Sequence, residues 1–282
     1  MAATGVMALP ALNSGSGDLW PRLASAAVLA PLALAVAYVG PPVFEAALIA
    51  VAGVLAWEWT ALCGSHRASL MRALLTLVAA AAVLLVATDE MWPAVIAIGA
   101  GTLAAAALEG DAAEGKGKRA WMAIGVVYIA VPVAALEWLR LAPHGRELVA
   151  WLLIVVWASD TVAYVFGRTF GGPKLAPSIS PKKTWSGLAG AVIGAAAGGG
   201  FCALAFGADD AAGFALMAAL FGLVGQGGDL MESAIKRRFG VKDTSRIIPG
   251  HGGLFDRLDA FMAVVVLAAA ARAAGWTGGT TW

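Results

Sequence analysis

The chain has 282 residues, of which 60% are hydrophobic and only 13% charged, with a net charge of +1 at pH 7 and a mean hydropathy of +0.81. This composition excludes a soluble domain, and the balanced charge gives no electrostatic reason to expect nucleic acid as a partner. The apolar runs are continuous rather than alternating, which argues against a β-barrel. We therefore expect an all-α, polytopic integral membrane protein.

The first 19 residues carry no Lys or Arg and contain Asp18, so they predict a disordered N-terminal tail rather than a cleaved signal peptide. The rest of the chain divides into N-terminal membrane helices at 20–145 and C-terminal catalytic membrane helices with cytoplasmic site loops at 146–282. Apolar stretches predict about nine transmembrane helices, near 21–39, 43–62, 70–88, 91–108, 120–139, 148–168, 185–206, 211–235 and 258–275.

Loop charge predicts the orientation. With a cytoplasmic N-terminus, sixteen of the nineteen Lys and Arg fall on the cytoplasmic side, and only Arg140, Arg146 and Arg272 fall outside. This split follows the positive-inside rule. We expect a multi-pass protein of a bacterial-type inner (cytoplasmic) membrane, with its N-terminus and active site in the cytoplasm, where nucleotides are.

Two acids lie near the ends of early spans. Glu58 stands between Trp57 and Trp59, and Glu137 directly precedes Trp138. Trp is common at membrane–water interfaces. We interpret both acids as interfacial side chains that reach toward water within an aromatic belt.

The sixth and seventh spans contribute the next polar residues. Asp160 lies roughly two turns from the cytoplasmic end of the sixth span at Arg168. Lys182 and Lys183 open the seventh span, and two lysines at a helix N-terminus predict an anion site. Positive-inside anchoring would also account for these lysines.

Glycines punctuate the seventh and eighth spans. Gly190, Gly194 and Gly198 recur at four-residue spacing, which predicts close helix packing rather than chemistry. The run 225–228, Gly-Gln-Gly-Gly, removes side-chain bulk just before Asp229. A ligand or a neighbouring backbone could approach closely there.

Asp229, Glu232, Ser233 and Lys236 share one helix face, because they recur at i, i+3, i+4 and i+7. A carboxylate inside a membrane segment costs roughly 2.5–3.5 kcal/mol at the helix centre, so it normally faces a polar cavity. An ordinary helix end with cytoplasmic charges is the alternative. Asp229 favours the first reading, since it lies a full turn or more inside the apolar run.

The stretch 233–259 concentrates charge, with six Lys or Arg, three Asp and one His in 27 residues. Asp256 and Asp259 stand at i, i+3 where the last span begins. They could complement the helix dipole, or bind Mg²⁺ together with Asp229. Arg257 could pair with a phosphate or a carboxylate, and His251 could be either a structural hydrogen bonder or a catalytic group.

The run 233–259 resembles the C-terminal motif of the phosphatidate cytidylyltransferase, or CDP-diacylglycerol synthase, family. The family pattern is S-x-apolar-K-R, four residues, K-D, and then H-G-G-x-x-D-R-x-D, and every fixed position is present. The S-D-T-x-A-Y segment at 159–164 and I-S-P-K-K-T-W at 179–185 resemble upstream motifs. Where the family commonly has Glu-Gly after this Trp, the chain has Ser186-Gly187. The resemblance covers roughly 155–262.

The resemblance implies that CTP and phosphatidate are converted to CDP-diacylglycerol and pyrophosphate. It implies Mg²⁺, leaves a second monovalent or divalent cation open, and suggests a homodimer in the lipid bilayer. By matched position, Asp229 and Asp256 would be metal ligands and Asp259 a ligand or an orienting group. The phosphate contacts would come from Ser233, Lys236, Arg237 and Arg257, with Lys182 and Lys183 closing the pocket, Asp160 in support, and His251 in a substrate-binding rather than a basic role.

Three other functions compete with this one. A CTP-dependent polyprenol kinase would use similar carboxylates and lysines, but the long H-G-G-x-x-D-R-x-D match argues against it. A transporter often shows two corresponding halves, whereas the charge here lies mostly in the second half. A structural scaffold would not need acids and cations concentrated at the membrane.

Overall fold

The computed structural model describes residues 19–110, 117–245, 247–248 and 252–276. The predicted tail at 1–19 lies almost entirely outside them, as does His251. Within these ranges the chain forms nine α-helices and two short strands: α1 Leu19–Val39, α2 Val43–Cys63, α3 Ala68–Ala87, α4 Met91–Glu109, α5 Lys118–Arg140, α6 Gly145–Thr169, β1 Lys174–Ala176, β2 Ser180–Thr184, α7 Trp185–Ala205, α8 Ala211–Arg238 and α9 Phe255–Ala273.

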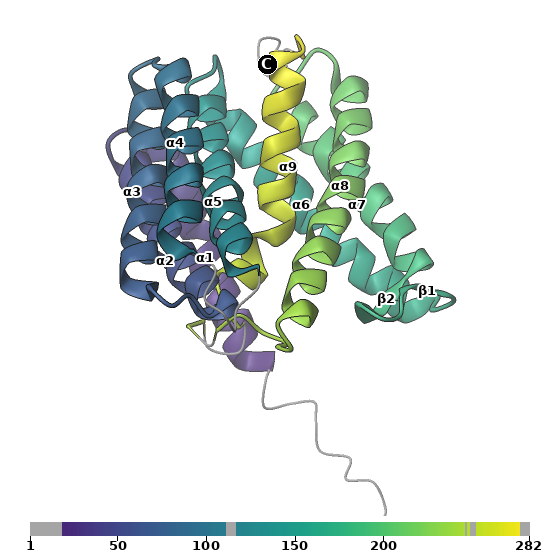
Figure 1. Cartoon of the computed structure of the whole chain (residues 1–282). Helices are drawn as coiled ribbons and strands as arrows, with labels where there is room; N and C mark the ends of the chain where they lie inside the picture. The colour runs from purple at the N-terminus through teal and green to yellow at the C-terminus, as the bar shows by residue number, and fades with distance from the viewer. Residues whose placement is uncertain (1–18, 111–116, 246, 249–251, 277–282) are drawn as a thin grey trace, which may run out of the picture.

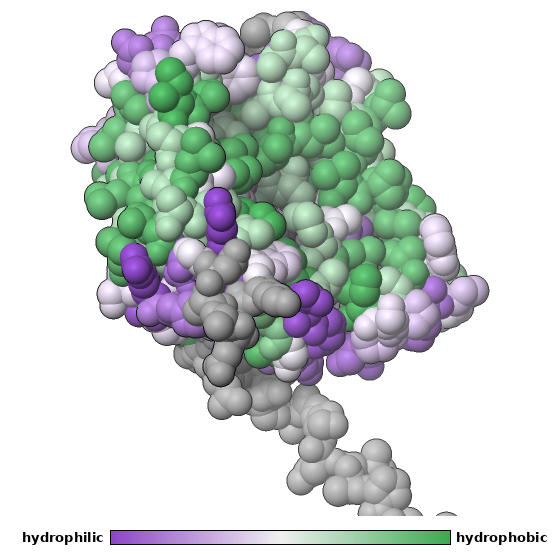
Figure 2. All heavy atoms as spheres, viewed as in Figure 1, coloured by the Kyte–Doolittle hydropathy of each residue, from purple (hydrophilic) through white to green (hydrophobic). Residues whose placement is uncertain are grey.

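The helices confirm an all-α membrane architecture. Of the described helices, the seven from α2 to α8 are long and apolar enough to cross a bilayer. Helix α1 contains a shorter apolar stretch, Ala27–Val39, and α9 carries four charged residues along its length. Figure 2 shows hydrophobic residues across the middle of the visible face and hydrophilic residues at both ends of the bundle, as expected for a protein surrounded by lipid.

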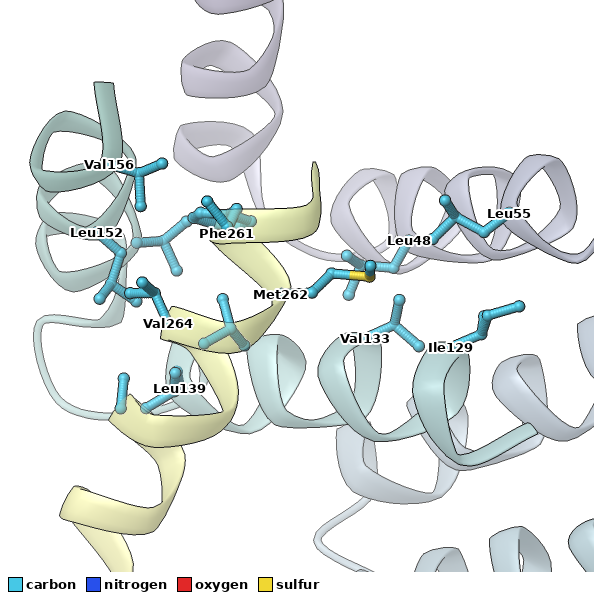
Figure 3. Packing of buried hydrophobic residues seen from close by; sticks show 14 of the residues in the cluster. Leu48, Leu55, Ile129, Val133, Leu139, Leu152, Val156, Phe261, Met262 and Val264 are labelled. Atoms are coloured by element: carbon cyan, nitrogen blue, oxygen red, sulfur yellow. The ribbon is translucent and has the colours of Figure 1, made fainter. Parts of the chain in front are cut away.

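Helix α9 lies between two groups of helices (Figure 1). On one side α2, α3, α4 and α5 pack against one another, and on the other α6 packs on α7 and α7 on α8, while α9 contacts both α5 and α8. Figure 3 shows Met262 of α9 pointing toward Leu48 and Val133, and other buried side chains of α9 meeting those of α6. The first residues of α9 are therefore fixed by both groups.

The glycines of α7 allow α6 to approach closely. A β-carbon at Gly190 would overlap the side chain of Phe166, and one at Gly194 would lie 2.6 Å from both the Val162 β-carbon and the Ala158 carbonyl oxygen. The prediction that these glycines serve packing is confirmed. The two helices lie too close for larger side chains at these positions.

A two-stranded hairpin between α6 and α7 was not predicted. β1 and β2 are antiparallel, with Lys174 opposite Thr184, and Thr184 then caps α7 by accepting a hydrogen bond from the Gly187 N–H at 3.1 Å. The expectation that Lys182 and Lys183 begin a helix is wrong, because both lie on β2. Side chains alternate along a strand, so the two lysines face opposite sides of the hairpin.

Replacing Gly194 by Ala is expected to destabilise the fold by about 1–3 kcal/mol, because overpacking forces the backbones of α6 and α7 apart. The matched control is Gly99→Ala in α4, where a β-carbon meets no atom within 4 Å. Thermal unfolding of the purified variants in detergent measures the difference. Equal melting temperatures for the two variants would show that the α6–α7 contact is looser than described.

Candidate active site

Polar side chains of β2, α6, α8 and α9 lie close together, toward the end of the bundle that carries the β1–β2 hairpin in Figure 1. The Lys183 ammonium, on β2, lies 2.7 Å from Asp229 Oδ2 on α8 and donates to Gln226 Oε1 at 2.9 Å. The amide of Gln226 in turn donates to Asp160 Oδ1 of α6 at 3.2 Å. The hairpin, α6 and α8 are thus joined by one chain of polar contacts.

Lys236 holds two acids at the lower end of α8. Its ammonium lies 2.7 Å from Glu232 Oε2 and 2.7 Å from Asp256 Oδ1. The other oxygen of Asp256 accepts hydrogen bonds from the Gly253 N–H at 2.8 Å and from the backbone and hydroxyl of Thr244, both at 3.2 Å. Asp256 therefore already has a full set of partners.

Three carboxylates could hold a metal ion. Asp229, Glu232 and Asp259 each offer one oxygen, and these oxygens lie within 4.8 Å of one another. Glu232 is only 1% exposed, and its Oε1 has no hydrogen-bond partner among the described residues. Hard oxygen ligands converging in this way suit Mg²⁺, and an unpartnered buried oxygen is what a cation would satisfy.

The predicted metal pair, Asp229 and Asp256, is divided between two clusters in the described structure. Asp229 lies with Glu232 and Asp259, whereas Asp256 is held by Lys236 and by backbone N–H groups. Helix α9 comes close to α8 at Gly228, where a β-carbon would lie 2.8 Å from the Asp259 carbonyl oxygen. The glycine run before Asp229 therefore admits a neighbouring backbone, one of the two alternatives that the sequence left open.

The other predicted site residues lie at the edges of this network. Ser233 is buried, with its hydroxyl 3.4 Å from Asp229 Oδ1. Arg237 is exposed and donates to the carbonyl oxygens of Ile179 at 3.3 Å and Val241 at 2.9 Å, which ties the hairpin loop to the end of α8. Lys182 and Arg257 are exposed.

The interpretation of Glu58 and Glu137 as interfacial acids is wrong, since they are 0% and 1% exposed. Glu58 instead accepts hydrogen bonds from the Leu254 N–H at 2.9 Å, the Phe255 N–H at 2.7 Å and the Ser245 hydroxyl. Flanking tryptophans suggested a membrane interface, but Trp59 points inward, donating to the Trp121 carbonyl at 2.9 Å. The sequence around Glu58 carries no signal of this internal role, because two of its partners are backbone N–H groups far along the chain.

The sequence gives Gln226 no role, and it gives Glu232 only a place on the helix face of Asp229, without a site role. Gln226 is buried and links Lys183 to Asp160, and Glu232 links Lys236 to the carboxylate cluster. Both lie one turn or less from Asp229 on α8. A polar residue inside an apolar helix normally faces a polar partner, and this signal could have identified Gln226 as well.

The chain is similar in sequence to a known protein family. A model of the cytidylyltransferase family matches residues 20–274, which include every residue of the network. A phosphatidate cytidylyltransferase of Brucella abortus is 36% identical over 251 residues, covering 89% of this chain and 92% of that protein. The same enzyme of Haemophilus influenzae is 41% identical over 133 residues, which cover 43% of this chain and 44% of that protein. That of Rickettsia felis is 36% identical over 152 residues, which cover 50% of this chain and 66% of that protein.

Replacing Lys236 by Met is expected to destabilise the protein by about 3–5 kcal/mol, because removing one partner from a buried ion pair leaves uncompensated charge. The matched control is Arg238→Met, an exposed cation at the same helix end. Thermal unfolding in detergent should give a much lower transition for the Lys236 variant than for the control. A transition within a degree of the control's would mean that Glu232 and Asp256 do not depend on Lys236.

Proposed function

The chain belongs to the cytidylyltransferase family, and from that premise we propose that it transfers CMP from CTP to phosphatidate, giving CDP-diacylglycerol and pyrophosphate. The observation that carries this proposal is the convergence of Asp229, Glu232 and Asp259 beside two lysines at one end of an apolar bundle. Carboxylates that can hold a hard cation, next to ammonium groups that can face phosphates, suit a reaction between two anions.

A lipid phosphate oxygen forms a bond to the α-phosphorus of CTP, and the bond from that phosphorus to the bridging oxygen of the β-phosphate breaks as pyrophosphate leaves. Both reactants are anionic, so alignment and charge neutralisation dominate catalysis. The attacking phosphomonoester has a second pKa of about 6 and is already ionised at neutral pH. No general base is needed, which agrees with the substrate-binding role predicted for His251.

Mg²⁺ is the proposed cofactor, with Asp229, Glu232 and Asp259 as its ligands. When bound, Mg²⁺ neutralises charge on phosphate oxygens. The choice of Asp259 and Glu232 over Asp256 is supported by the contacts of Asp256 with Lys236 and Gly253. In this arrangement Asp256 orients Lys236 instead of binding the ion.

The basic residues around the carboxylates would bind the phosphates. Lys183, held by Gln226 and Asp229, and Lys236 are buried enough for their charges to act in a medium of low dielectric. Ser233, Arg237, Arg257 and Lys182 keep the phosphate-binding roles that the family resemblance implies, with Asp160 in support through Gln226.

The site is proposed to face the cytoplasm. The hairpin and the end of α8 lie at one end of the bundle, and α9 begins on the side facing that end (Figure 1). The basic loops that define the cytoplasmic side include these segments. CTP would enter from water, while the acyl chains of phosphatidate stay in the inner leaflet. A bacterial-type inner membrane and a homodimer remain predictions.

The proposed activity is tested with the purified protein, phosphatidate, Mg²⁺ and CTP labelled at either the α- or the γ-phosphate. We expect lipid-bound label from α-labelled CTP and none from γ-labelled CTP. Label reaching lipid only from the γ-phosphate would favour a lipid kinase instead. Transport of substrate in proteoliposomes without nucleotide turnover would revive a transporter.

The ligand assignment is tested with Asp229→Asn, Asp259→Asn and Asp256→Asn, each assayed over a range of Mg²⁺ concentrations. Asp229→Asn and Asp259→Asn are expected to lower kcat by at least about 100-fold, a loss of roughly 2.7 kcal/mol in transition-state stabilisation, while the protein still folds. Asp256→Asn should lower kcat without raising the half-saturating Mg²⁺ concentration. If instead Asp256→Asn were the only variant to change the half-saturating Mg²⁺ concentration, Asp256 and not Asp259 would be the ligand.

A further inference from the structure

The start of α9 has no capping side chain of its own. Leu254 occupies the N-cap position, and its side chain makes no capping hydrogen bond, although the first N–H groups of a helix lack partners within the helix. Glu58 of α2, 196 and 197 residues earlier, supplies the acceptors: Oε1 for the Leu254 N–H at 2.9 Å and Oε2 for the Phe255 N–H at 2.7 Å. A negative charge at a helix N-terminus is also favoured by the helix dipole.

Glu58 is held rigidly enough to fix what it touches. It is 0% exposed, and Oε1 also accepts from the Ser245 hydroxyl. The neighbouring Trp59 packs on Phe255, with ring centroids 5.6 Å apart, and on Tyr128 at 5.5 Å. The first turn of α9 is therefore attached to α2 by both hydrogen bonds and aromatic packing.

The approach of Glu58 accounts for the second glycine of Gly252-Gly253. A β-carbon at Gly253 would overlap both the Glu58 carboxylate and the Thr244 hydroxyl. Gly253 also donates its N–H to Asp256 at 2.8 Å. Gly253 therefore lies between two carboxylates, that of Asp256 in α9 and that of Glu58 in α2.

We propose that Glu58 is a positioning residue for the reaction. By fixing the start of α9 along its axis and in rotation, Glu58 keeps Asp256 facing Lys236 and Asp259 facing Asp229. This inference rests on the proposed function. Phe255, whose N–H binds Glu58, stands one residue before Asp256 and four before Asp259. On a helix, a shift of that first turn moves both carboxylates together.

The test compares Glu58→Gln with a matched control, Glu109→Gln. Glu109 of α4 is another buried acid that caps a loop, accepting from the Ser65 hydroxyl at 2.7 Å and the His66 N–H at 2.8 Å, and both of these partners lie in the loop between α2 and α3. Both variants lose one charged acceptor. Three quantities are measured: kcat and the KM for CTP, the half-saturating Mg²⁺ concentration, and hydrogen–deuterium exchange of the amides at 253–258.

Glu58→Gln is expected to lower kcat at least tenfold, to raise the half-saturating Mg²⁺ concentration at least threefold, and to speed exchange at 253–258 at least tenfold. Glu109→Gln should leave all three within twofold of the unaltered chain. If Glu58→Gln lowers only the melting temperature, and leaves kcat and exchange at 253–258 unchanged, Glu58 is a stabilising residue and the proposal is wrong.

Should Glu58→Gln not fold, Ser245→Ala decides, since it removes one donor to the carboxylate without altering buried charge: a fall in kcat of at least threefold supports the proposal, and unaltered kcat and exchange overturn it. If the unaltered chain makes no lipid-bound cytidine, the proposed function fails. Exchange at 253–258 still decides whether Glu58 positions α9.

Discussion

The structure depends on pairing charge inside an apolar bundle. An isolated charge in this environment is costly, and the chain places Lys183 2.7 Å from Asp229 and Lys236 2.7 Å from both Glu232 and Asp256. The Lys183–Asp229 pair joins β2 to α8 and the Lys236–Asp256 pair joins α8 to α9, so these charges also fix the positions of β2, α8 and α9. The groups suited to bind phosphate and metal are therefore the same groups that hold the end of the bundle together.

Helix α9 transmits this constraint to the N-terminal helices. Its first five residues include Asp256 and Asp259, its apolar faces pack on α5 and α8, and Glu58 of α2 accepts hydrogen bonds from the N–H groups at its start. The helices before α6 thus do more than anchor the chain in lipid. They also help to hold the start of α9, and with it Asp256 and Asp259 of the candidate site, in position.

Much of this could be predicted from the sequence. The expected spans agree with the helices to within a few residues, and the shared face of Asp229, Glu232 and Lys236 follows from helical spacing alone. The β1–β2 hairpin escaped prediction because three- and five-residue strands leave almost no periodic signal. The role of Glu58 escaped because its partners are backbone N–H groups nearly 200 residues away, which no side-chain pattern reveals. The division of the acids between Lys236 and the carboxylate cluster depends on how α9 is rotated against α8, and spacing within one helix does not set that rotation.

The central claim is that Asp229, Glu232 and Asp259 surround one divalent cation. The most direct measurement is anomalous X-ray scattering from crystals of the purified chain grown with Mn²⁺ in place of Mg²⁺. An anomalous peak within about 2.0–2.3 Å of one oxygen from each of these carboxylates is the predicted result. A peak bound by Asp256 and not by Asp259, with Lys236 displaced from Asp256, would contradict it.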